Sequence, residues 1–443
     1  MDENRNRVPA GRARRVVAHG IVHERPLSGL GRASRALRGP ESAKRPESAG
    51  ENKEEAETSL NNSEYELNNS KSIGITAESD GDESDLPSVS LIVAAYNEED
   101  VIAEKIENSL ELDYPDEQLE LLVFSDASND ATDDIVRSYA DEGVELIRVE
   151  GRVGKTQCQN VVAEQADGEI LVFSDANSMY EPDAIRRLVA EFDDDVGCVV
   201  GGLHYENVGD DTGGIPVYRR FERFVQRSES RTGSVVKGNG AIYAVRADEY
   251  VPLSADLMSD FGEPLAIRSR GKQVKFAPDA IAREQARDSL DSQRDAENRI
   301  TTRSWHTLSA FSELLNPAEY GTYSVKLWSR TALLWLTPVA LGVAGSSALL
   351  LALLEPTGLH LAFAGGFAAF ALSVGLTEAA KRRGRTAPLP LQAAHYFALL
   401  NYSLVVGLSN FLRGRNIVTW DTDERPEEAD ASEANAANPQ GGT

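Results

Sequence analysis

Two aspartates follow two similar apolar runs, and their side chains could act on one ligand. Asp126 follows "LELLVFS" in the stretch "FSDASND", and Asp175 follows "EILVFS" in "FSDANSM". Asn177 stands two residues after Asp175, so a carboxylate and an amide oxygen share one turn. Oxygen ligands of this kind suit Mg²⁺ or Mn²⁺, which keeps waters and substrate phosphates in its shell. A cation held there would offset the charge of a diphosphate leaving group. Aspartates that only cap turns or helices are the alternative.

A glycine-containing loop could add phosphate contacts to this pair. The segment "GRVGKTQCQN" places Gly151, Gly154 and Lys155 directly before a helix-like pattern. Backbone N–H groups and a lysine at the start of a helix suit a phosphate group. The sequence has no GxxxxGK[ST] motif, and no GxGxxG follows its first strand. These absences argue against a P-loop NTPase and against a dinucleotide-dependent oxidoreductase.

Alternating strand and helix patterns between residues 87 and 285 must position these groups. The runs "VSLIVAAYN", "LELLVFSD", "VELIRVE" and "EILVFSD" are typical of buried strands, and helix-like segments separate them. In the first helix-like segment the apolar face consists of Val101, Ile102, Ile106 and Leu110. Continuous apolar strands with helices between them predict an α/β fold, with a mostly parallel sheet covered on both faces. Such sheets bind ligands outside the carboxyl ends of their strands. We therefore expect Asp126 and Asp175 to lie at one edge, on two neighbouring strands.

The motifs together resemble glycosyltransferase family 2, the inverting enzymes with the glycosyltransferase-A fold. In the order and spacing of that family, this chain has "VSLIVAAYNEE" (89–99), "FSDASNDAT" (124–132), "GKTQCQN" (154–160), "FSDAN" (173–177), "KGNGAIYAVR" (237–246) and "SDFGEPLAIRSRGKQVKFAPDAIARE" (259–284). The resemblance covers roughly 200 residues. The apolar segments that follow resemble the membrane-anchored, polysaccharide-synthase-like branch of the family.

The resemblance implies a role for each matching position. The donor would be a nucleotide-diphosphate sugar, bound by Ala95, Tyr96, Asn97, Glu98, Asp126, Lys155 and Asp175. Asp175 and Asn177 would hold Mg²⁺ or Mn²⁺ at the diphosphate. Asp260 would be the catalytic base. The pocket for the acceptor and the donor sugar would include Gly238, Gly240, Arg303 and Trp305.

Three departures from the family pattern keep other interpretations open. Asn177 stands where the family usually has aspartate, and Ser259 stands where an acidic residue is common. The Gln-x-x-Arg-Trp clamp of processive synthases is absent, and an amphipathic helix on the membrane explains "NRITTRSWHTL" (298–308) as well. Asp260 could also cap a helix, because Glu263 three residues later resembles a capping box. A catalytically weak or inactive sugar-nucleotide-binding scaffold and a sugar-nucleotide nucleotidyltransferase are the alternative functions.

Long apolar segments near the C-terminus predict a membrane anchor. The stretches 332–354 and 359–377 are long enough to cross a bilayer, whereas 391–412 is weaker and could be re-entrant or interfacial. The basic connector "KRRGR" (381–385) is expected on the cytoplasmic side. We therefore predict a multi-pass protein of the cell membrane with a cytoplasmic catalytic domain and a lipid-linked or polysaccharide acceptor.

Composition predicts the boundaries of the domains and tails. We predict a disordered tail over 1–86, a nucleotide-sugar-binding domain over 87–290, a juxtamembrane segment over 291–330, two to three transmembrane helices over 331–415 and an acidic disordered tail over 416–443. The formal net charge of −26 argues against a general nucleic-acid binder. The two cysteines, Cys158 and Cys198, form no disulfide framework.

Overall fold

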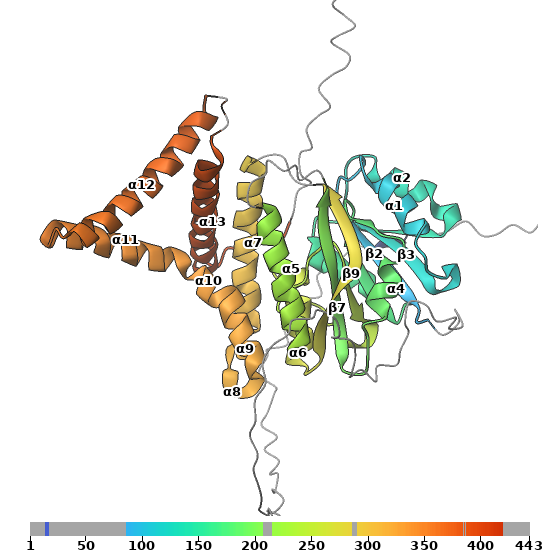
Figure 1. The fold of residues 1–443 in the computed structure, drawn as a ribbon. Coiled ribbons are helices and arrows are strands. Elements are labelled where there is room, and N and C mark those ends of the chain that lie inside the picture. The colour runs from blue at the N-terminus through green and yellow to red at the C-terminus, as the bar shows by residue number, and fades with distance from the viewer. Residues whose placement is uncertain are drawn as a thin grey trace, which may run out of the picture.

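A mixed, mostly parallel sheet forms the centre of the molecule (Figure 1). The structure is a computed structural model, and it describes residues 14–16, 86–206, 215–285, 290–383, 385 and 387–419. The strand order is β1-β4-β3-β2-β5-β8-β7-β9-β6. The strands are β1 (Arg14–Val16), β2 (Val89–Ala95), β3 (Leu119–Ser125), β4 (Val144–Val149), β5 (Ile170–Asp175), β6 (Met179–Tyr180), β7 (Val196–Glu206), β8 (Tyr243–Arg246) and β9 (Gln273–Gln285).

The parallel half of the sheet contains the four strands that the sequence predicts. Strands β4, β3, β2 and β5 run parallel side by side, and β8 continues the sheet antiparallel to β5. Strand β2 lies between β3 and β5, so the two strands that end near Asp126 and Asp175 are not neighbours. The prediction of adjacent strands is therefore wrong. Two strand spacings of about 4.8 Å separate β3 from β5.

Helices cover both faces of this sheet, as its apolar strands predict. On β2, Leu91 and Val93 belong to one buried cluster, while Ile92 and Ala94 belong to a second cluster on the opposite face. The helices of this domain are α1 (Ile102–Leu110), α2 (Thr132–Ser138), α3 (Lys155–Ala163), α4 (Ala184–Val189), α5 (Ile215–Arg231) and α6 (Ser259–Ser269). Leu110, predicted to face inward, is 38% exposed, and Lys105 is fully buried within the same helix.

A third apolar cluster joins the sheet domain to the C-terminal helices. It contains Val236, Phe261 from α6, Leu308 and Trp335. The helices that follow α6 are α7 (Leu290–Ala310), α8 (Pro317–Tyr320), α9 (Thr322–Leu327), α10 (Leu333–Trp335), α11 (Thr337–Leu354), α12 (Gly358–Lys381) and α13 (Leu389–Leu412). Figure 1 shows α11 and α12 projecting away from the sheet, while α13 lies along α7.

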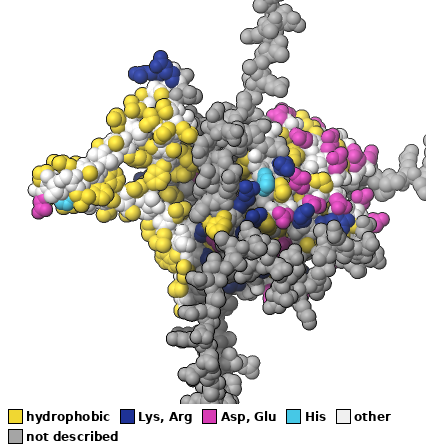
Figure 2. All heavy atoms as spheres, viewed as in Figure 1, with side chains coloured by type: hydrophobic (Ala, Val, Ile, Leu, Met, Phe, Trp, Pro, Cys, Tyr) yellow, Lys and Arg dark blue, Asp and Glu magenta, His cyan; other side chains and the backbone are white. Residues whose placement is uncertain are grey.

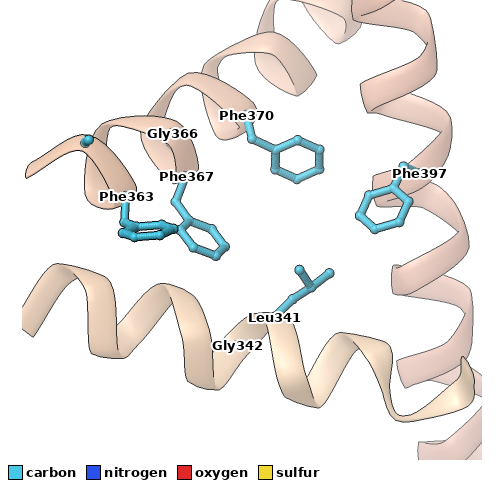
Figure 3. Close-up of a pocket in the computed structure, with 8 residues that line it drawn as sticks. Leu341, Gly342, Phe363, Gly366, Phe367, Phe370 and Phe397 are labelled. Atoms are coloured by element: carbon cyan, nitrogen blue, oxygen red, sulfur yellow. The ribbon is translucent and has the colours of Figure 1, made fainter. Parts of the chain in front are cut away.

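Helices α11, α12 and α13 are each long and apolar enough to cross a membrane. Their side chains cover the projecting part of the molecule with apolar surface (Figure 2). Between them lies an apolar pocket of about 490 Å³ (Figure 3), lined by Leu341, Gly342, Ala362, Phe363, Gly366, Phe367, Phe370 and Phe397. Lipid hydrocarbon chains would cover this apolar surface without leaving backbone hydrogen bonds unmade, because the helices pair their own backbone polar groups.

Both predicted tails lie mostly outside the described residues. Three residues of the N-terminal one form β1, which pairs with β4 along residues 147–149. Four residues of the C-terminal one, 416–419, are described. The disorder predicted for the remainder stays a prediction.

Candidate active site

Loops at the carboxyl edge of β2, β3 and β5 gather the predicted donor-binding residues. Asp175 is the last residue of β5 and is in register with Ala94 of β2. Ala95 ends β2 in register with Ser125 of β3, and its carbonyl accepts a hydrogen bond from the Asp126 N–H at 3.1 Å. Asp126 and Asp175 therefore flank the end of β2 from opposite sides.

Asp126 holds the glycine-containing loop in place. Its carboxylate is fully buried and accepts hydrogen bonds from the Val153 N–H at 2.8 Å and the Gly154 N–H at 3.0 Å. The guanidinium of Arg152 also donates to it, at 3.1 Å. These two backbone N–H groups thus bind a carboxylate of the protein, although the sequence suggested that they bind phosphate. The loop owes its shape to this charge-assisted network.

The end of β2 and the Arg152 loop form one wall of the site. The Arg152 guanidinium lies 3.2 Å from the centre of the Tyr96 ring, an arrangement typical of cation–π contacts. Asn97 has a positive φ of 52° and accepts a hydrogen bond from the Asn129 N–H at 2.9 Å. The Glu98 N–H donates to Thr132 at 2.8 Å. Hydrogen bonds and the Arg152–Tyr96 contact thus hold the loops of the predicted nucleobase pocket together. The sequence did not single out Arg152 as part of this pocket.

Lys155 and Asp175 form an ion pair in the middle of the site. Gly240 lies against this pair: a Cβ atom at that position would sit 3.0 Å from Asp175 Oδ2 and 3.1 Å from Lys155 Nζ. The absence of a side chain at Gly240 therefore keeps one carboxylate oxygen of Asp175 accessible. Gly238 is equally tight, because its Cβ would lie 2.7 Å from the carbonyl oxygen of Asp260.

The turn after β5 carries the two residues predicted to bind a divalent cation. Asp175 has a half-buried carboxylate, and Asn177, which has an amide oxygen, follows two residues later. The part of the chain that the structure describes contains no group of three or more His, Cys, Asp or Glu residues placed to hold a metal. A cation with two protein ligands fits Mg²⁺ or Mn²⁺, which fill the remaining positions with water and phosphate oxygens.

A buried lysine, Lys105, contacts the turn after β5. Lys105 of α1 donates a hydrogen bond to the Ser178 carbonyl, and its ammonium lies 3.9 Å from the centre of the Tyr180 ring. The Ser178 hydroxyl donates to Glu284 at 2.5 Å. Burial lowers the pKa of Lys105 to about 7, while Asp175 and Glu284 act in the opposite direction. No sequence pattern indicated this residue except its place beside the apolar face of α1.

Asp260 lies in the first turn of α6 and interacts electrostatically with Lys155 and Asp175. The residue that caps α6 is Met258, and no side chain forms a capping hydrogen bond there, so the interpretation of Asp260 as a helix cap is wrong. Burial raises the pKa of Asp260; Lys155, Lys237 and Arg303 lower it, whereas Asp175 adds to the rise. The Gly238 N–H binds the Asp260 carbonyl at 2.9 Å. Asp260 is therefore a carboxylate within electrostatic range of Lys155 and Asp175.

Arg303 and Trp305 of α7 occupy different environments. The Arg303 guanidinium is buried and donates to Thr156 at 2.8 Å and to the Leu257 carbonyl. The Trp305 ring lies 4.7 Å from the ring of Trp335, centre to centre, within the third apolar cluster. Helix α7 is therefore packed into the protein along this stretch, which differs from a helix lying freely on the membrane. Arg303 still interacts electrostatically with Asp260.

The segment after α13 also reaches the loop that contains Arg152 and Gly154. The carbonyl oxygen of Val418 would lie 2.5 Å from a Cβ atom at Gly154. His306 of α7 contacts the Arg415 carbonyl at 3.2 Å. The sequence assigned residues 416–443 to a disordered tail, and no pattern indicated that residues 415–418 pass beside the site.

Comparison with known proteins agrees with this geometry. The model of the family described as glycosyl transferase family 2 matches residues 90–251. This range contains the end of β2, the Arg152 loop, the turn after β5 and the Gly238–Gly240 segment. Asp260 lies beyond the matched range, so its assignment rests on the motif resemblance and on the geometry.

Curated relatives match over part of their length. "Probable glycosyltransferase YdaM" of Bacillus subtilis is 31% identical over 28% of this chain and 31% of its own. Beta-monoglucosyldiacylglycerol synthase of Trichormus variabilis is 30% identical over 35% of each chain. Poly-beta-1,6-N-acetyl-D-glucosamine synthase of Staphylococcus aureus is 23% identical over 44% of this chain and 50% of its own. The chain thus spans about a third to a half of these relatives.

A solved structure shares the fold over most of the chain. Mannosyltransferase PcManGT from Pyrobaculum calidifontis, solved in complex with GDP-Man and Mn²⁺, superposes with a TM-score of 0.60. The alignment covers 76% of this chain and 90% of that one at 21% identity. This likeness supports the predicted glycosyltransferase-A arrangement of the sheet and its helices.

Proposed function

We propose that this chain, whose residues 90–251 are a glycosyltransferase family 2 domain, transfers a sugar from a nucleotide-diphosphate sugar to an acceptor at a membrane. The proposal rests chiefly on the Gly238–Gly240 segment, which binds the Asp260 carbonyl through Gly238 and lies against the Lys155–Asp175 ion pair through Gly240. This arrangement supports a base beside a diphosphate site. Relatives named as glycosyltransferases or polysaccharide and glycolipid synthases support the same reaction class.

The donor would lie across the ends of β3, β2 and β5. Its nucleoside would contact the wall formed by Tyr96, Asn97 and Arg152. Its diphosphate would lie near Lys155 and Asp175. A divalent cation on Asp175 and Asn177 would offset the charge that develops on the departing nucleoside diphosphate. Lys155 must then release Asp175 and can bind a phosphate oxygen in its place.

Asp260 would accept the proton of the acceptor hydroxyl. As the acceptor oxygen forms its bond to the anomeric carbon, the bond to the diphosphate breaks and the nucleoside diphosphate leaves. The proton passes to the carboxylate, so the transfer is balanced. Burial raises the Asp260 pKa, which makes the carboxylate a better base while Lys155, Lys237 and Arg303 keep it within reach of the ionised state. Attack on the face opposite the leaving group gives inversion.

The C-terminal helices would place this site at the membrane surface. Nucleotide sugars are cytoplasmic metabolites, so we place the catalytic domain on that side. A lipid-linked or polysaccharide acceptor would then reach the site from the side of α10 and α11, where the third apolar cluster ends at Trp335.

A ligand screen tests this proposal. The full-length protein, purified in detergent, is heated with UDP-, GDP- and dTDP-linked sugars in the presence of Mn²⁺. A ligand that binds the native state at a hundred times its Kd stabilises it by about 2.7 kcal/mol. We expect at least one donor to raise the melting temperature with Mn²⁺ and much less with chelator. No shift with any donor would contradict the proposal, and a shift without any turnover would favour the inactive scaffold.

A further inference from the structure

One cation near Asp260, Lys237, is not among the residues proposed to bind the donor. Lys237 precedes Gly238, whose N–H binds the Asp260 carbonyl at 2.9 Å. Its ammonium lies 4.9 Å from the centre of the Phe261 ring and 5.7 Å from that of the Trp335 ring. Among the residues that the structure describes, Lys237 forms no hydrogen bond and no ion pair; its partners are these two rings and the more distant charges of the site.

The surroundings make this an uncommon place for a lysine. Burial lowers the pKa of Lys237, and the charge of Arg330 lowers it further. Asp260, Glu222 and Glu297 act in the opposite direction and raise it. Glu222 already pairs with Arg330 through two contacts. A desolvated ammonium that lacks a directly paired carboxylate gains much from an anion that binds beside it.

The position of Lys237 relative to the membrane restricts what that anion can be. Asp260 interacts with Lys155 and Asp175 from the donor site and also with Lys237. Lys237 in turn contacts Trp335, which ends α10 two residues before the apolar helix α11 begins. Gly240 lies against the ion pair, Gly238 binds the Asp260 carbonyl and Lys237 contacts Trp335, so the segment 237–240 connects the ion pair to the Trp335 side. An acceptor arriving from the bilayer meets Lys237 before its hydroxyl reaches the base.

We propose that the acceptor is a lipid that carries a phosphate or diphosphate on the membrane side of its nucleophilic hydroxyl, and that Lys237 binds this phosphate. The inference rests on the proposed function, because it assigns the acceptor of the same site. It separates this chain from enzymes that use a neutral lipid or a neutral polysaccharide. The aromatic rings of Phe261 and Trp335 would contact the first carbons of the lipid chain.

A binding experiment with matched lipids tests the inference without needing the acceptor sugar. The full-length protein in neutral detergent with EDTA is titrated with farnesyl diphosphate, farnesol and inorganic diphosphate. EDTA removes the metal, so that the diphosphate does not bind through the donor site. We expect farnesyl diphosphate to bind at least about tenfold more tightly than farnesol or inorganic diphosphate. Only farnesyl diphosphate makes both the charge-assisted contact and the lipid contacts, and their binding free energies add.

Three variants assign the effect to Lys237. Lys237→Gln should abolish the preference for farnesyl diphosphate over farnesol, and Lys237→Arg should retain most of it. Lys275→Gln is the matched control, because Lys275 lies on β9 near Glu191. Equal binding of farnesol and farnesyl diphosphate by the wild type would overturn the inference. So would a preference that survives in Lys237→Gln, or inorganic diphosphate binding as tightly as the lipid.

A second readout separates this inference from the proposed function. Metal-dependent release of nucleoside diphosphate from a donor, with water as acceptor, is measured on the wild type. If the wild type hydrolyses donor but does not prefer the phosphorylated lipid, only the acceptor assignment fails. If no donor is hydrolysed while the lipid preference depends on Lys237, the proposed transfer reaction fails and the lipid site stands.

Discussion

Individual charged residues in this protein are distinguished by what surrounds them. Asp126 and Asp175 follow nearly identical sequences, yet one carboxylate is fully buried and occupied by loop N–H groups, and the other is half-buried and accessible. Asp126 therefore shapes a loop, whereas Asp175 is free to exchange its lysine for a cation. The sequence indicated that both residues lie at one sheet edge. Their roles differ because their carboxylates are buried to different extents, and this burial depends on the loops around them.

Replacement of Asp260 by asparagine tests its assignment as the base. The side chain forms no helix cap, so the amide should preserve α6 and leave the melting temperature and donor binding close to those of the wild type. Loss of a general base typically lowers the rate by about 10²–10⁴-fold. We expect transfer to fall at least about a hundredfold at saturating donor. A variant that transfers sugar within a few-fold of the wild-type rate would leave the base unassigned.

Lys105 should give the protein a specific pH dependence of stability. Its pKa is about 7 in the folded protein, mainly because of burial, and 10.5 in the unfolded chain. Between these values the unfolded chain binds more protons, so this lysine's contribution to stability rises with pH across that window and is smallest below pH 7. Lys105→Met should remove this term, which amounts to about 1.4 kcal/mol per pH unit for one full proton. The check is the difference in melting temperature between pH 6.5 and 8.5, compared in the two proteins. An identical pH response in both would show that Lys105 does not titrate as described.

At the scale of elements, the sequence predicted the parallel half of the sheet better than the rest. Strands β2 to β5 are buried on both faces and therefore have continuous apolar sequences that are easy to recognise. Their order across the sheet is set by crossover connections, and so the position of β2 between β3 and β5 was not predicted. The start of α6 was hidden because Pro264 lies inside its first turns. Arg152, Lys105 and Lys237 were missed because their partners come from elements distant in the chain.

The Gly238–Gly240 segment should tolerate no side chain beside the proposed metal ligand Asp175. In Gly240→Ala the added Cβ would sit 3.0 Å from Asp175 Oδ2 and 3.1 Å from Lys155 Nζ, tighter than ordinary van der Waals contact. We expect Mn²⁺ affinity in the presence of a nucleoside diphosphate to drop by about tenfold, a loss of about 1.4 kcal/mol. Gly271→Ala is a control for substitution alone, because nothing lies near its Cβ, although its φ of 90° adds local strain. Unchanged Mn²⁺ binding in Gly240→Ala, measured by electron paramagnetic resonance, would place the metal elsewhere.

At the scale of the whole molecule, α13 differs from α11 and α12. It lies along α7, where Thr301 donates to the Ser403 carbonyl at 2.9 Å and Asn410 donates to Thr302 at 3.2 Å. The chain after it returns to the catalytic domain at Gly154. If α11 and α12 cross the bilayer and return to the cytoplasm, α13 then begins and ends on that side. This arrangement also leaves Arg413 and Arg415 on the cytoplasmic side, as the positive-inside rule favours.

Cysteine labelling in cells tests this topology. The two native cysteines are buried, so single cysteines introduced at Thr357, Arg383 and Arg415 report their own positions. We expect an impermeant maleimide added from outside to label only the cysteine at 357. Labelling at 415 from outside would instead show that α13 crosses the membrane and that its contacts with α7 do not persist in the bilayer.

The central claim is that the domain cleaves a nucleotide-sugar donor at the Asp175 turn with the help of a metal. The most direct test is the steady-state release of nucleoside diphosphate from the donor that stabilises the protein most, measured with Mn²⁺ and with chelator for the wild type and for Asp175→Ala. We expect slow release by the wild type that requires Mn²⁺, and a loss of at least about a hundredfold in the variant. Release that persists in chelator, or in Asp175→Ala at the wild-type rate, would contradict it.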